Sequence, residues 1–399
     1  MKYKILYLTY HPEIGGGETM LINLLLNLNK ELFEPIVVVP KIGQLSEKLK
    51  QLNIQTHILP LNGYLIRTFF VPGMSPFGIY RFLRLAKKLK PHLIHVNHLN
   101  LAVYAGFAGR LLKIPIIATS HGPWDSVYFF QDIASTIFVD KILANTEDSA
   151  HAIVRRKIVD AKKVEVIYFG IDTNYFKPGD KQQARRTLRL PQNSLIVTIV
   201  GRLDPIKDHM TFLKAALLVS KKCTDITFFI VGSKLGDFSD NRDDNSYETR
   251  IKQFVNQHSS LAKKIIWGGF IDDMPTVYHA TDILVSSSLS ESFGIALCEA
   301  GASGIPVVAT NSGGQHLVVK NGESGYLVKP RHPEQIAQKI MQLAKNLKLR
   351  QRLGLHAKNH IVKNYPIEKY VRKVQKIYLT HSTSSGLMLS KAEALEFLK

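Results

Sequence analysis

The chain has 399 residues, of which 45% are hydrophobic and 21% charged, a composition that excludes a disordered protein. A chain of this length exceeds the size at which one hydrophobic core stops growing, so it predicts two domains. Its two cysteines, Cys223 and Cys298, exclude a disulfide framework and a cysteine-rich metal cluster, and they favour reduced thiols in the cytoplasm. The formal net charge of +20 leaves four meanings open: nucleic acid, anionic lipid, a polyanionic substrate or an ordinary solvated surface.

The basic residues are concentrated in two places. Residues 331–380 carry twelve Lys or Arg and two Glu, and residues 79–90 carry five basic residues and no acid. The apolar run at 5–8 is too short for a signal peptide, and the run at 99–109 falls short of the ~20 residues of a membrane span. We therefore expect a cytoplasmic protein that is soluble or peripheral on the inner membrane face.

Short β-branched runs alternate with longer amphipathic stretches, which is typical of βαβ units with parallel strands. In the first half the predicted strands are 4–9, 35–39, 55–58, 93–96, 116–119, 141–144 and 164–167. In the second half they are 195–200, 226–231, 265–267, 283–286, 306–309 and 325–328. Each set predicts an open, doubly wound α/β sheet, and such sheets bind ligands at the carboxyl ends of their strands.

A segment rich in Gly, Pro and polar residues, 170–191, separates the two sets. We place an N-terminal Rossmann-like domain at 1–175, a second at 176–360, and a C-terminal helix with a tail at 361–399. The helix is expected to pack near the domain junction, and the binding site to lie in a central cleft that the two domains face.

In the C-terminal region, Pro366 is expected to break or restart a helix. An apolar stripe among the lysines predicts packing on a domain surface; it consists of Ile361, Tyr365, Tyr370, Val374, Ile377 and Tyr378. The tail from Ser382 stays open among a terminal helix, an interface peptide and a frayed end.

Residues 286–314, SSSLSESFGIALCEAGASGIPVVATNSGG, contain the most informative pattern in the chain. A strand is followed by a serine-rich loop with Glu291, and then by a helix that we expect to start around Phe293 and to contain Glu299. Amides at a helix N-terminus, here those of Ser292, Phe293 and Gly294, can hold an anion. A carboxylate among Ala, Leu, Cys and Gly is unlike a surface residue and needs partners. The alternative is a solvated loop acid and an ordinary helix-surface acid.

This segment resembles the signature of the retaining glycosyltransferases of family 4, which have the GT-B fold, and the resemblance extends over nearly the whole chain. It implies that Glu291 and the amides of Ser292, Phe293 and Gly294 bind the donor sugar, and that Glu299 binds the ribose of the nucleotide. It also implies a nucleotide-sugar donor, with UDP favoured slightly over GDP, and transfer with retention of configuration.

Two cations follow the strand 195–200, in GRLDPIK. Arg202 and Lys207 can converge on one pyrophosphate, the first as a planar fork and the second as a point charge. By resemblance they neutralise the leaving diphosphate in place of a metal, so no metal or cofactor is expected. The alternative is a pair of surface cations bound to Asp204 and Asp208.

Four further residues match the family. Gly16 and Gly17 follow the first strand in GGGE, which departs from the dinucleotide fingerprint, and by resemblance they face the diphosphate. His121 ends the fifth strand, and by resemblance it contacts the donor sugar near the reacting carbon. Gly232 follows the strand 226–231, and by resemblance it lies near the cleft and helps to bind the donor. A tight turn, a structural histidine and an ordinary loop glycine are the alternatives.

The acceptor is poorly specified by the sequence. Residues 63–80 are aromatic with one cation, Arg67, and a basic stretch follows, which is compatible with a lipid-linked acceptor at a membrane or with a buried loop and a solvated helix. A glycan acceptor is equally open, and surface polysaccharide or glycolipid synthesis follows from the resemblance alone. A nucleotide-sugar epimerase, a catalytically silent GT-B subunit and a nucleic-acid-binding protein are the rival hypotheses, although no nucleic-acid motif is present.

Overall fold

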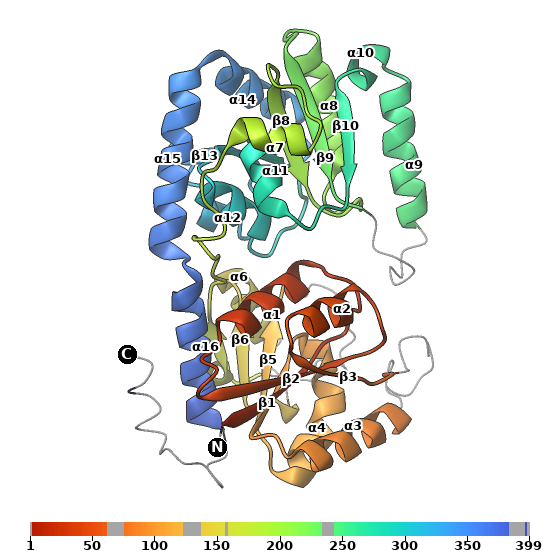
Figure 1. Cartoon of the computed structure of the whole chain (residues 1–399), viewed down its shortest axis with the longest axis vertical. Coiled ribbons are helices and arrows are strands. Elements are labelled where there is room, and N and C mark those ends of the chain that lie inside the picture. The colour runs from red at the N-terminus through yellow and green to blue at the C-terminus, as the bar shows by residue number, and fades with distance from the viewer. Residues whose placement is uncertain are drawn as a thin grey trace. The chain divides into compact units, whose positions relative to one another are not determined.

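The computed structural model describes residues 2–61, 76–122, 137–155, 159–233, 243–382 and 396. The chain folds into two compact units, one of Met1–Gly170 with Ile367–Lys399 and the other of Ile171–Pro366 (Figure 1). The first boundary lies five residues before the predicted one, and the segment predicted as separate is divided between the units. A β-bridge joins Ile171 to Pro366, and this bridge brings both boundary positions together within the second unit.

The first unit contains a seven-stranded parallel sheet with the order β3-β2-β1-β4-β5-β6-β7. Its strands are β1 (Tyr3–Leu8), β2 (Phe33–Val39), β3 (Gln55–Ile58), β4 (Leu93–Val96), β5 (Ile116–Ser120), β6 (Lys141–Ala144) and β7 (Val164–Val166). Every strand predicted in this half is present, with bounds that agree within two residues. The chain moves outward from β1 through β3 and then returns to the other side of β1, so the switch point lies between β1 and β4.

Helices cover this sheet (Figure 1). They are α1 (Gly16–Asn27), α2 (Gln44–Gln51), α3 (Pro76–Leu89), α4 (Ala102–Leu112), α6 (Glu147–Arg155) and α16 (Ile367–His381), with short 3₁₀ turns at Leu99–Leu101 and Ala161–Lys163. The core consists of strand residues such as Leu6 and Ile94 packed with helix residues such as Phe82 and Ala105.

The second unit contains a six-stranded parallel sheet with the order β10-β9-β8-β11-β12-β13. Its strands are β8 (Leu195–Val200), β9 (Ile226–Val231), β10 (Ile265–Gly269), β11 (Ile283–Ser286), β12 (Val307–Thr310) and β13 (Gly325–Val328). Its helices are α7 (Lys181–Thr187), α8 (His209–Ser220), α9 (Asp243–Asn256), α10 (Ser259–Ala262), α11 (Met274–Ala280), α12 (Ile295–Ala302), α13 (Gln315–Val318), α14 (Pro333–Lys345) and α15 (Leu347–Asn364). All predicted strands of this half are present, and the switch point lies between β8 and β11.

The C-terminal helices follow the prediction. Helix α15 ends at Asn364 and α16 begins at Ile367, so Pro366 interrupts the helix, because proline lacks the amide that helix continuation requires. The predicted apolar stripe is buried throughout; it comprises Ile361, Tyr365, Tyr370, Val374, Ile377 and Tyr378. Helix α16 belongs to the first unit, where the hydroxyl of Tyr378 lies 2.5 Å from Nδ1 of His95.

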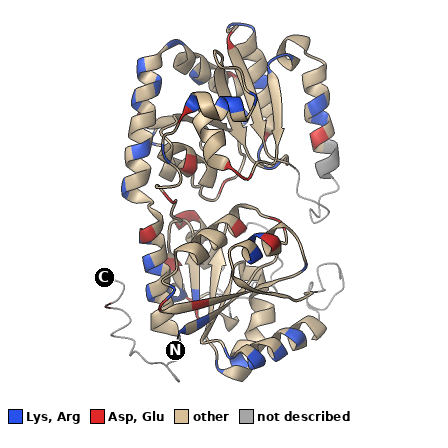
Figure 2. Ribbon diagram, viewed as in Figure 1, with Lys and Arg blue, Asp and Glu red and all other residues tan. Residues whose placement is uncertain are grey.

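The structure bears on three features considered from composition: membrane spans, cysteines and basic residues. Among the described residues, no helix is long and apolar enough to cross a membrane. Both cysteines are free, Cys298 buried and Cys223 partly buried. Basic residues occur on both units, including α3 and α15 (Figure 2). The predictions for most of the aromatic segment 63–80 and for the tail beyond Ser382 lie outside the described residues.

Candidate active site

The switch point of the second sheet brings two loops together. Strands β8 and β11 are neighbours, and the loop after β8 carries Arg202 and Lys207 while the loop after β11 carries Glu291. The amide of Leu289 donates to the carbonyl oxygen of Ile206 at 2.7 Å, which ties the two loops through their backbones. Adjacent strands of a parallel sheet end at the same edge, so residues more than eighty positions apart in sequence meet here.

Lys207 and Glu291 form an ion pair across these two loops. The hydroxyl of Ser288 donates to the same carboxylate oxygen at 3.3 Å, and the hydroxyl of Ser287 donates to the carbonyl oxygen of Lys207 at 2.9 Å. The side chains of the ion pair are about four-fifths buried, with exposed fractions of 22% and 18%. The structure thus brings the predicted phosphate-binding lysine and the predicted sugar-binding carboxylate into direct contact.

The glycine pair at the end of the motif supports the loop that carries Glu291. A Cβ atom on Gly313 would overlap the carbonyl oxygen of Glu291, and one on Gly314 would overlap that of Ser292. The amide of Gly314 donates to the carbonyl oxygen of Glu291 at 2.9 Å. Gly313 also has a φ of 55°, a conformation that L-residues rarely adopt. The two glycines therefore let the chain after β12 lie directly against the Glu291 loop.

Arg202 differs from its partner cation. Its side chain is 43% exposed, and its guanidinium binds Asp204 at 2.8 Å, which is the contact expected of a surface cation. Lys207, in contrast, contacts Asp204 only through its amide, at 3.0 Å. The described structure therefore joins Lys207 to Glu291 directly, while Arg202 stays on the same loop with its charge bound to a local acid.

Glu299 is buried inside α12, with 6% of its surface exposed, so it is no ordinary helix-surface acid. The hydroxyl of Tyr278, on α11, donates to Oε2 of Glu299 at 2.6 Å. Burial raises the pKa of Glu299 to about 7, and the hydrogen bond from Tyr278 opposes that rise. Sequence reasoning did not identify Tyr278, because tyrosine in the apolar pattern of a short helix is normally a core residue.

The helix after Glu291 begins at Ile295, two residues later than predicted. The reason is Gly294, which takes a φ of 92° and serves as the N-cap, so helical geometry starts only beyond it. The amides of Ser292, Phe293 and Gly294 consequently precede the helix and are not its first-turn donors. The ring of Phe293 is buried and packs against Tyr365, with centroids 5.3 Å apart, so its side chain belongs to the core.

Gly232 lies at the carboxyl end of β9, next to the β8 loop. A Cβ atom there would overlap the carbonyl oxygen of Gly201, and its φ is 138°. Its amide donates to the carbonyl oxygen of Gly269 at 2.7 Å. The glycine therefore keeps the backbone at the carboxyl edge of three neighbouring strands closely packed.

The first unit has its own polar cluster at the carboxyl ends of β1, β4 and β5. Gly17 lies against two histidine rings, since a Cβ there would be 3.2 Å from Nε2 of His121 and 3.3 Å from Cε1 of His98. Gly16 is the first residue of α1 and is exposed. Glu18, in the first turn of that helix, is 2% exposed and lies 2.9 Å from Nε2 of His98.

The cluster has strongly shifted protonation equilibria. Burial by itself raises the pKa of Glu18, but the hydrogen bond and charge of His98, with the nearby His11 and His121, outweigh it and lower the pKa to about 2. Burial, with the charge of His98, lowers the pKa of His121 to about 3. Nε2 of His121 is buried without a hydrogen-bond partner in the described part of the chain. His121 is thus a neutral imidazole beside Gly17.

A further polar network lies after β6, and the described residues also bear on a metal site. Asn145, Thr146 and Ser149, after β6, form a buried hydrogen-bond network in which the hydroxyl of Ser149 donates to Asn145 at 2.9 Å. In the described residues, no group of three or more His, Cys, Asp or Glu side chains is arranged to hold a metal ion.

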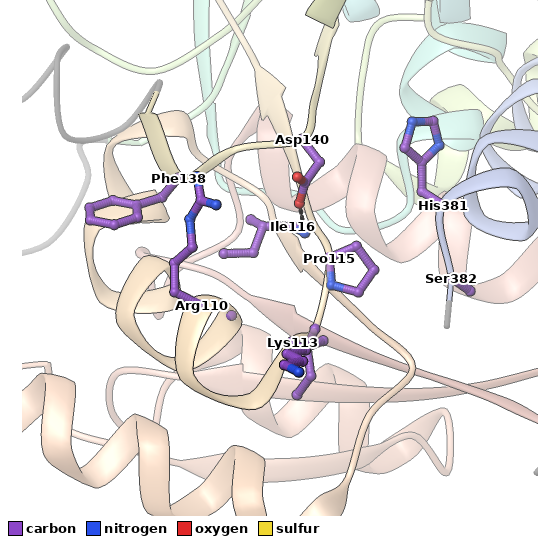
Figure 3. A pocket seen from close by; sticks show the side chains of 10 residues that line it. Arg110, Lys113, Pro115, Ile116, Phe138, Asp140, His381 and Ser382 are labelled. Atoms are coloured by element: carbon purple, nitrogen blue, oxygen red, sulfur yellow. Dashed lines mark hydrogen bonds between the residues drawn. The ribbon is translucent and has the colours of Figure 1, made fainter. Parts of the chain in front are cut away.

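A pocket of about 390 Å³ lies in the first unit, away from these residues. It is lined by Arg110, Lys113 and Asp140 and by the end of α16 (Figure 3). Because the amide of Ile116, the first residue of β5, donates to Asp140 at 2.7 Å, the pocket lies at the amino ends of the strands. Parallel sheets place ligand sites at the opposite edge, so this pocket is separate from the candidate active site.

Two Rossmann-like domains, each with polar residues at its switch point, define the GT-B class of glycosyltransferases. Structural comparison agrees: the HepE protein of Anabaena, crystallised in complex with UDP-glucose, matches with a TM-score of 0.81 over 94% of this chain and 99% of that one, at 21% identity. The sequence profile described as Glycosyltransferase Family 4 matches residues 14–175, and the one described as Glycosyl transferases group 1 matches residues 180–360. The chain belongs to glycosyltransferase family 4.

Two further relatives extend the comparison. The UDP-Gal:alpha-D-GlcNAc-diphosphoundecaprenol alpha-1,3-galactosyltransferase of Escherichia coli is 26% identical over 350 residues, which is 80% of this chain and 86% of that protein. The D-inositol 3-phosphate glycosyltransferase of Rhodococcus opacus (strain B4) is 32% identical over 210 residues. That match covers 51% of this chain and 45% of the relative, so the chain spans about half the length of this second protein.

Proposed function

We propose that this glycosyltransferase moves a sugar from a UDP-sugar to a lipid-linked acceptor, with retention of configuration and without a metal ion. The observation that carries the proposal is the contact between Lys207 and Glu291 at the switch point of the second sheet. The ammonium of Lys207 suits the diphosphate, and the carboxylate of Glu291 suits sugar hydroxyls. A bound nucleotide-sugar would therefore contact both at the bond that breaks.

The proposed roles follow from the chemistry of each side chain. Glu299 accepts the two ribose hydroxyls, since a carboxylate can accept two donors at once. Lys207 and Arg202 neutralise the diphosphate as it leaves, which is electrostatic stabilisation where charge develops. Glu291 binds hydroxyls of the donor sugar, and we assign a contact with that sugar to His121 as well. The acceptor hydroxyl attacks the anomeric carbon from the face that the diphosphate leaves and gives its proton to the departing diphosphate oxygen, and no protein nucleophile takes part.

The choice of substrates rests on the relatives. The enzyme of Escherichia coli carries UDP-galactose and a diphosphoundecaprenol-linked sugar in its name, and the HepE protein was crystallised with UDP-glucose. We therefore propose that the donor of this chain is a UDP-sugar and that its acceptor is linked to a lipid diphosphate. We propose surface polysaccharide or glycolipid assembly on the cytoplasmic side of the membrane as the pathway, because an acceptor linked to a lipid diphosphate suits such a pathway.

The first test is a thermal-shift panel with UDP, GDP, ADP and their sugars, in EDTA. A ligand that binds only the folded protein stabilises it by ~2.7 kcal/mol at a hundredfold its dissociation constant. We expect UDP to raise the melting temperature of the wild type and of Glu323→Gln, an exposed acid in the same unit, but not of Glu299→Gln. A larger shift with GDP would overturn the choice of donor, and no shift with any nucleotide would favour a silent subunit.

The second test follows the reaction itself. With UDP-sugars and a synthetic diphospholipid-linked acceptor, we expect product in EDTA, and ¹H NMR of the new bond should show the anomeric configuration of the donor. An inverted product would contradict the same-face mechanism, and activity that returns only with added divalent metal would contradict metal independence. Turnover of the donor without acceptor would point to an epimerase instead.

A further inference from the structure

Helix α3 carries a basic face with no acidic counterpart. The sequence has no Asp or Glu between Glu47 and Asp125, and α3 lies within this stretch. After Pro76, its exposed positions recur at helical spacing and share one face; they are Phe77, Tyr80, Arg81, Arg84, Lys87 and Lys88. The opposite face buries Phe82 and Ala86 in the core, so the orientation of the helix is set by packing. Figure 2 shows the basic positions along this helix.

The aromatic residues of this face are unusually exposed. Phe77 is 74% exposed and Tyr80 is 57% exposed. The guanidinium of Arg84 lies 5.9 Å from the centre of the Tyr80 ring, so charge and aromatic surface are presented together. A face made only for solubility would carry charges of both signs and would bury or omit such rings.

Helix α4, which packs beside α3, continues the surface. Its exposed positions are Phe107, Arg110 and Leu111, followed by Lys113, and Leu111 is 68% exposed. Arg110 donates to the carbonyl oxygen of Ile137 at 3.0 Å, which adds another exposed apolar side chain beside the helix. Arg110 and Lys113 also line the pocket in Figure 3, so the basic surface extends to its rim.

We propose that the outer face of α3 and α4, the α3–α4 face, binds the surface of an anionic lipid bilayer. Phe77, Tyr80, Phe107 and Leu111 would enter the interfacial region while the arginines and lysines contact lipid phosphates. Each basic residue near such a surface adds to the attraction by anionic lipids. Exposed aromatic and aliphatic side chains among the cations favour lipid as the occupant, because such side chains can enter the interfacial region of a bilayer. The inference rests on the proposed function, in which the acceptor is linked to a lipid.

The test is flotation of the full-length protein with vesicles of phosphatidylcholine alone, or of equal parts phosphatidylcholine and phosphatidylglycerol. We expect binding to the anionic vesicles only, and at least tenfold weaker binding for Arg81→Glu with Arg84→Glu. The matched control reverses two exposed cations of the second unit, Lys348→Glu with Arg352→Glu, and should bind like the wild type. Equal losses in the two double variants would mean that net charge alone drives binding, and would overturn the proposal.

A second pair of substitutions separates lipid from other polyanions. Phe77→Ser with Leu111→Ser keeps every charge, and we expect it to weaken vesicle binding at least tenfold without changing the weak binding of duplex DNA. Unchanged vesicle binding, or DNA binding tighter than vesicle binding, would contradict the assignment to a bilayer. The UDP-induced thermal shift should be the same in all these variants, so failure of the α3–α4 face is distinguishable from failure of the proposed reaction.

Discussion

Glu18 and His98 form a buried pair in which Nε2 of the imidazole lies 2.9 Å from a carboxylate oxygen. The amide of Gly15 also donates to Glu18, at 3.2 Å, so one carboxylate holds both the glycine turn and the histidine. His98 in turn packs against His121, with ring centroids 4.9 Å apart. The pair therefore fixes the glycine turn and the neutral His121 relative to each other.

Replacing Glu18 with Gln should destabilise the protein by about 1–3 kcal/mol near neutral pH, because a buried charged hydrogen bond is lost. The pKa of Glu18 is lowered from 4.5 to about 2, so its contribution is present above pH 4.5 and disappears as the pH falls toward 2. Urea denaturation of both proteins near neutral pH and below about pH 4 measures this. The exposed Glu31→Gln is the control, and a difference that stays constant with pH would refute the pair.

Lys207→Met should lower kcat by about 10²–10³-fold, because a positive charge is removed where the diphosphate leaves. The control is Lys214→Met, an exposed lysine on α8 in the same unit, which should keep wild-type turnover. Steady-state kinetics with donor and acceptor measure both. Since Lys207 also pairs with Glu291, the melting temperature should be compared; a drop in kcat explained entirely by unfolding would remove the assignment.

Stability should depend on pH through Glu299. Its pKa is raised by burial from 4.5 to about 7, so the protonated form favours the folded protein, and this stabilisation is complete below pH 4.5 and lost as the pH rises through 7. Glu299→Gln should therefore gain stability relative to the wild type between about pH 5 and pH 8. Melting temperatures of both proteins test this, with Glu323→Gln expected to show a flat difference.

The affinity for UDP should rise with pH, whereas the stability of the free protein should fall. If the ionised carboxylate of Glu299 accepts the ribose hydroxyls, UDP binding favours deprotonation, and the dissociation constant should fall as the pH rises through about 7. Calorimetry in two buffers of different ionisation enthalpy measures the proton released on binding. Proton uptake instead of release would mean that the protonated acid is the binding form.

Gly313→Ala tests the contact behind Glu291. The new Cβ would overlap the carbonyl oxygen of Glu291, whereas one on Gly322, which also has a positive φ, would have nothing within 4 Å. Backbone strain of about 1–2 kcal/mol is common to both alanine variants, so their difference reports the contact. We expect Gly313→Ala to lose most donor-sugar turnover while Gly322→Ala loses little, and equal activities would contradict this role.

Much of the fold follows from local pattern. Hydrophobic periodicity and turn residues are local properties of the chain, and each predicted strand is present within two residues of its predicted bounds. Helix α12 starts two residues later than the sequence predicts, because the φ of Gly294 depends on its surroundings. The burial of Glu299 was foreseeable from its apolar neighbours, whereas nothing local marks Tyr278, which lies 21 residues away, as its partner.

The sequence by itself determined that the chain forms two parallel α/β sheets, and with the family resemblance it predicts that Glu291, Glu299, Arg202 and Lys207 are its functional residues. Only the tertiary structure decided which of them meet. Lys207 reaches Glu291 across 84 positions and Glu18 reaches His98 across 80, because neighbouring parallel strands end at one edge whatever the length of chain between them. Tertiary contacts, and not residue type, then set the protonation of these groups: burial dominates for His121 and Glu299, whereas the contact with His98 outweighs burial for Glu18.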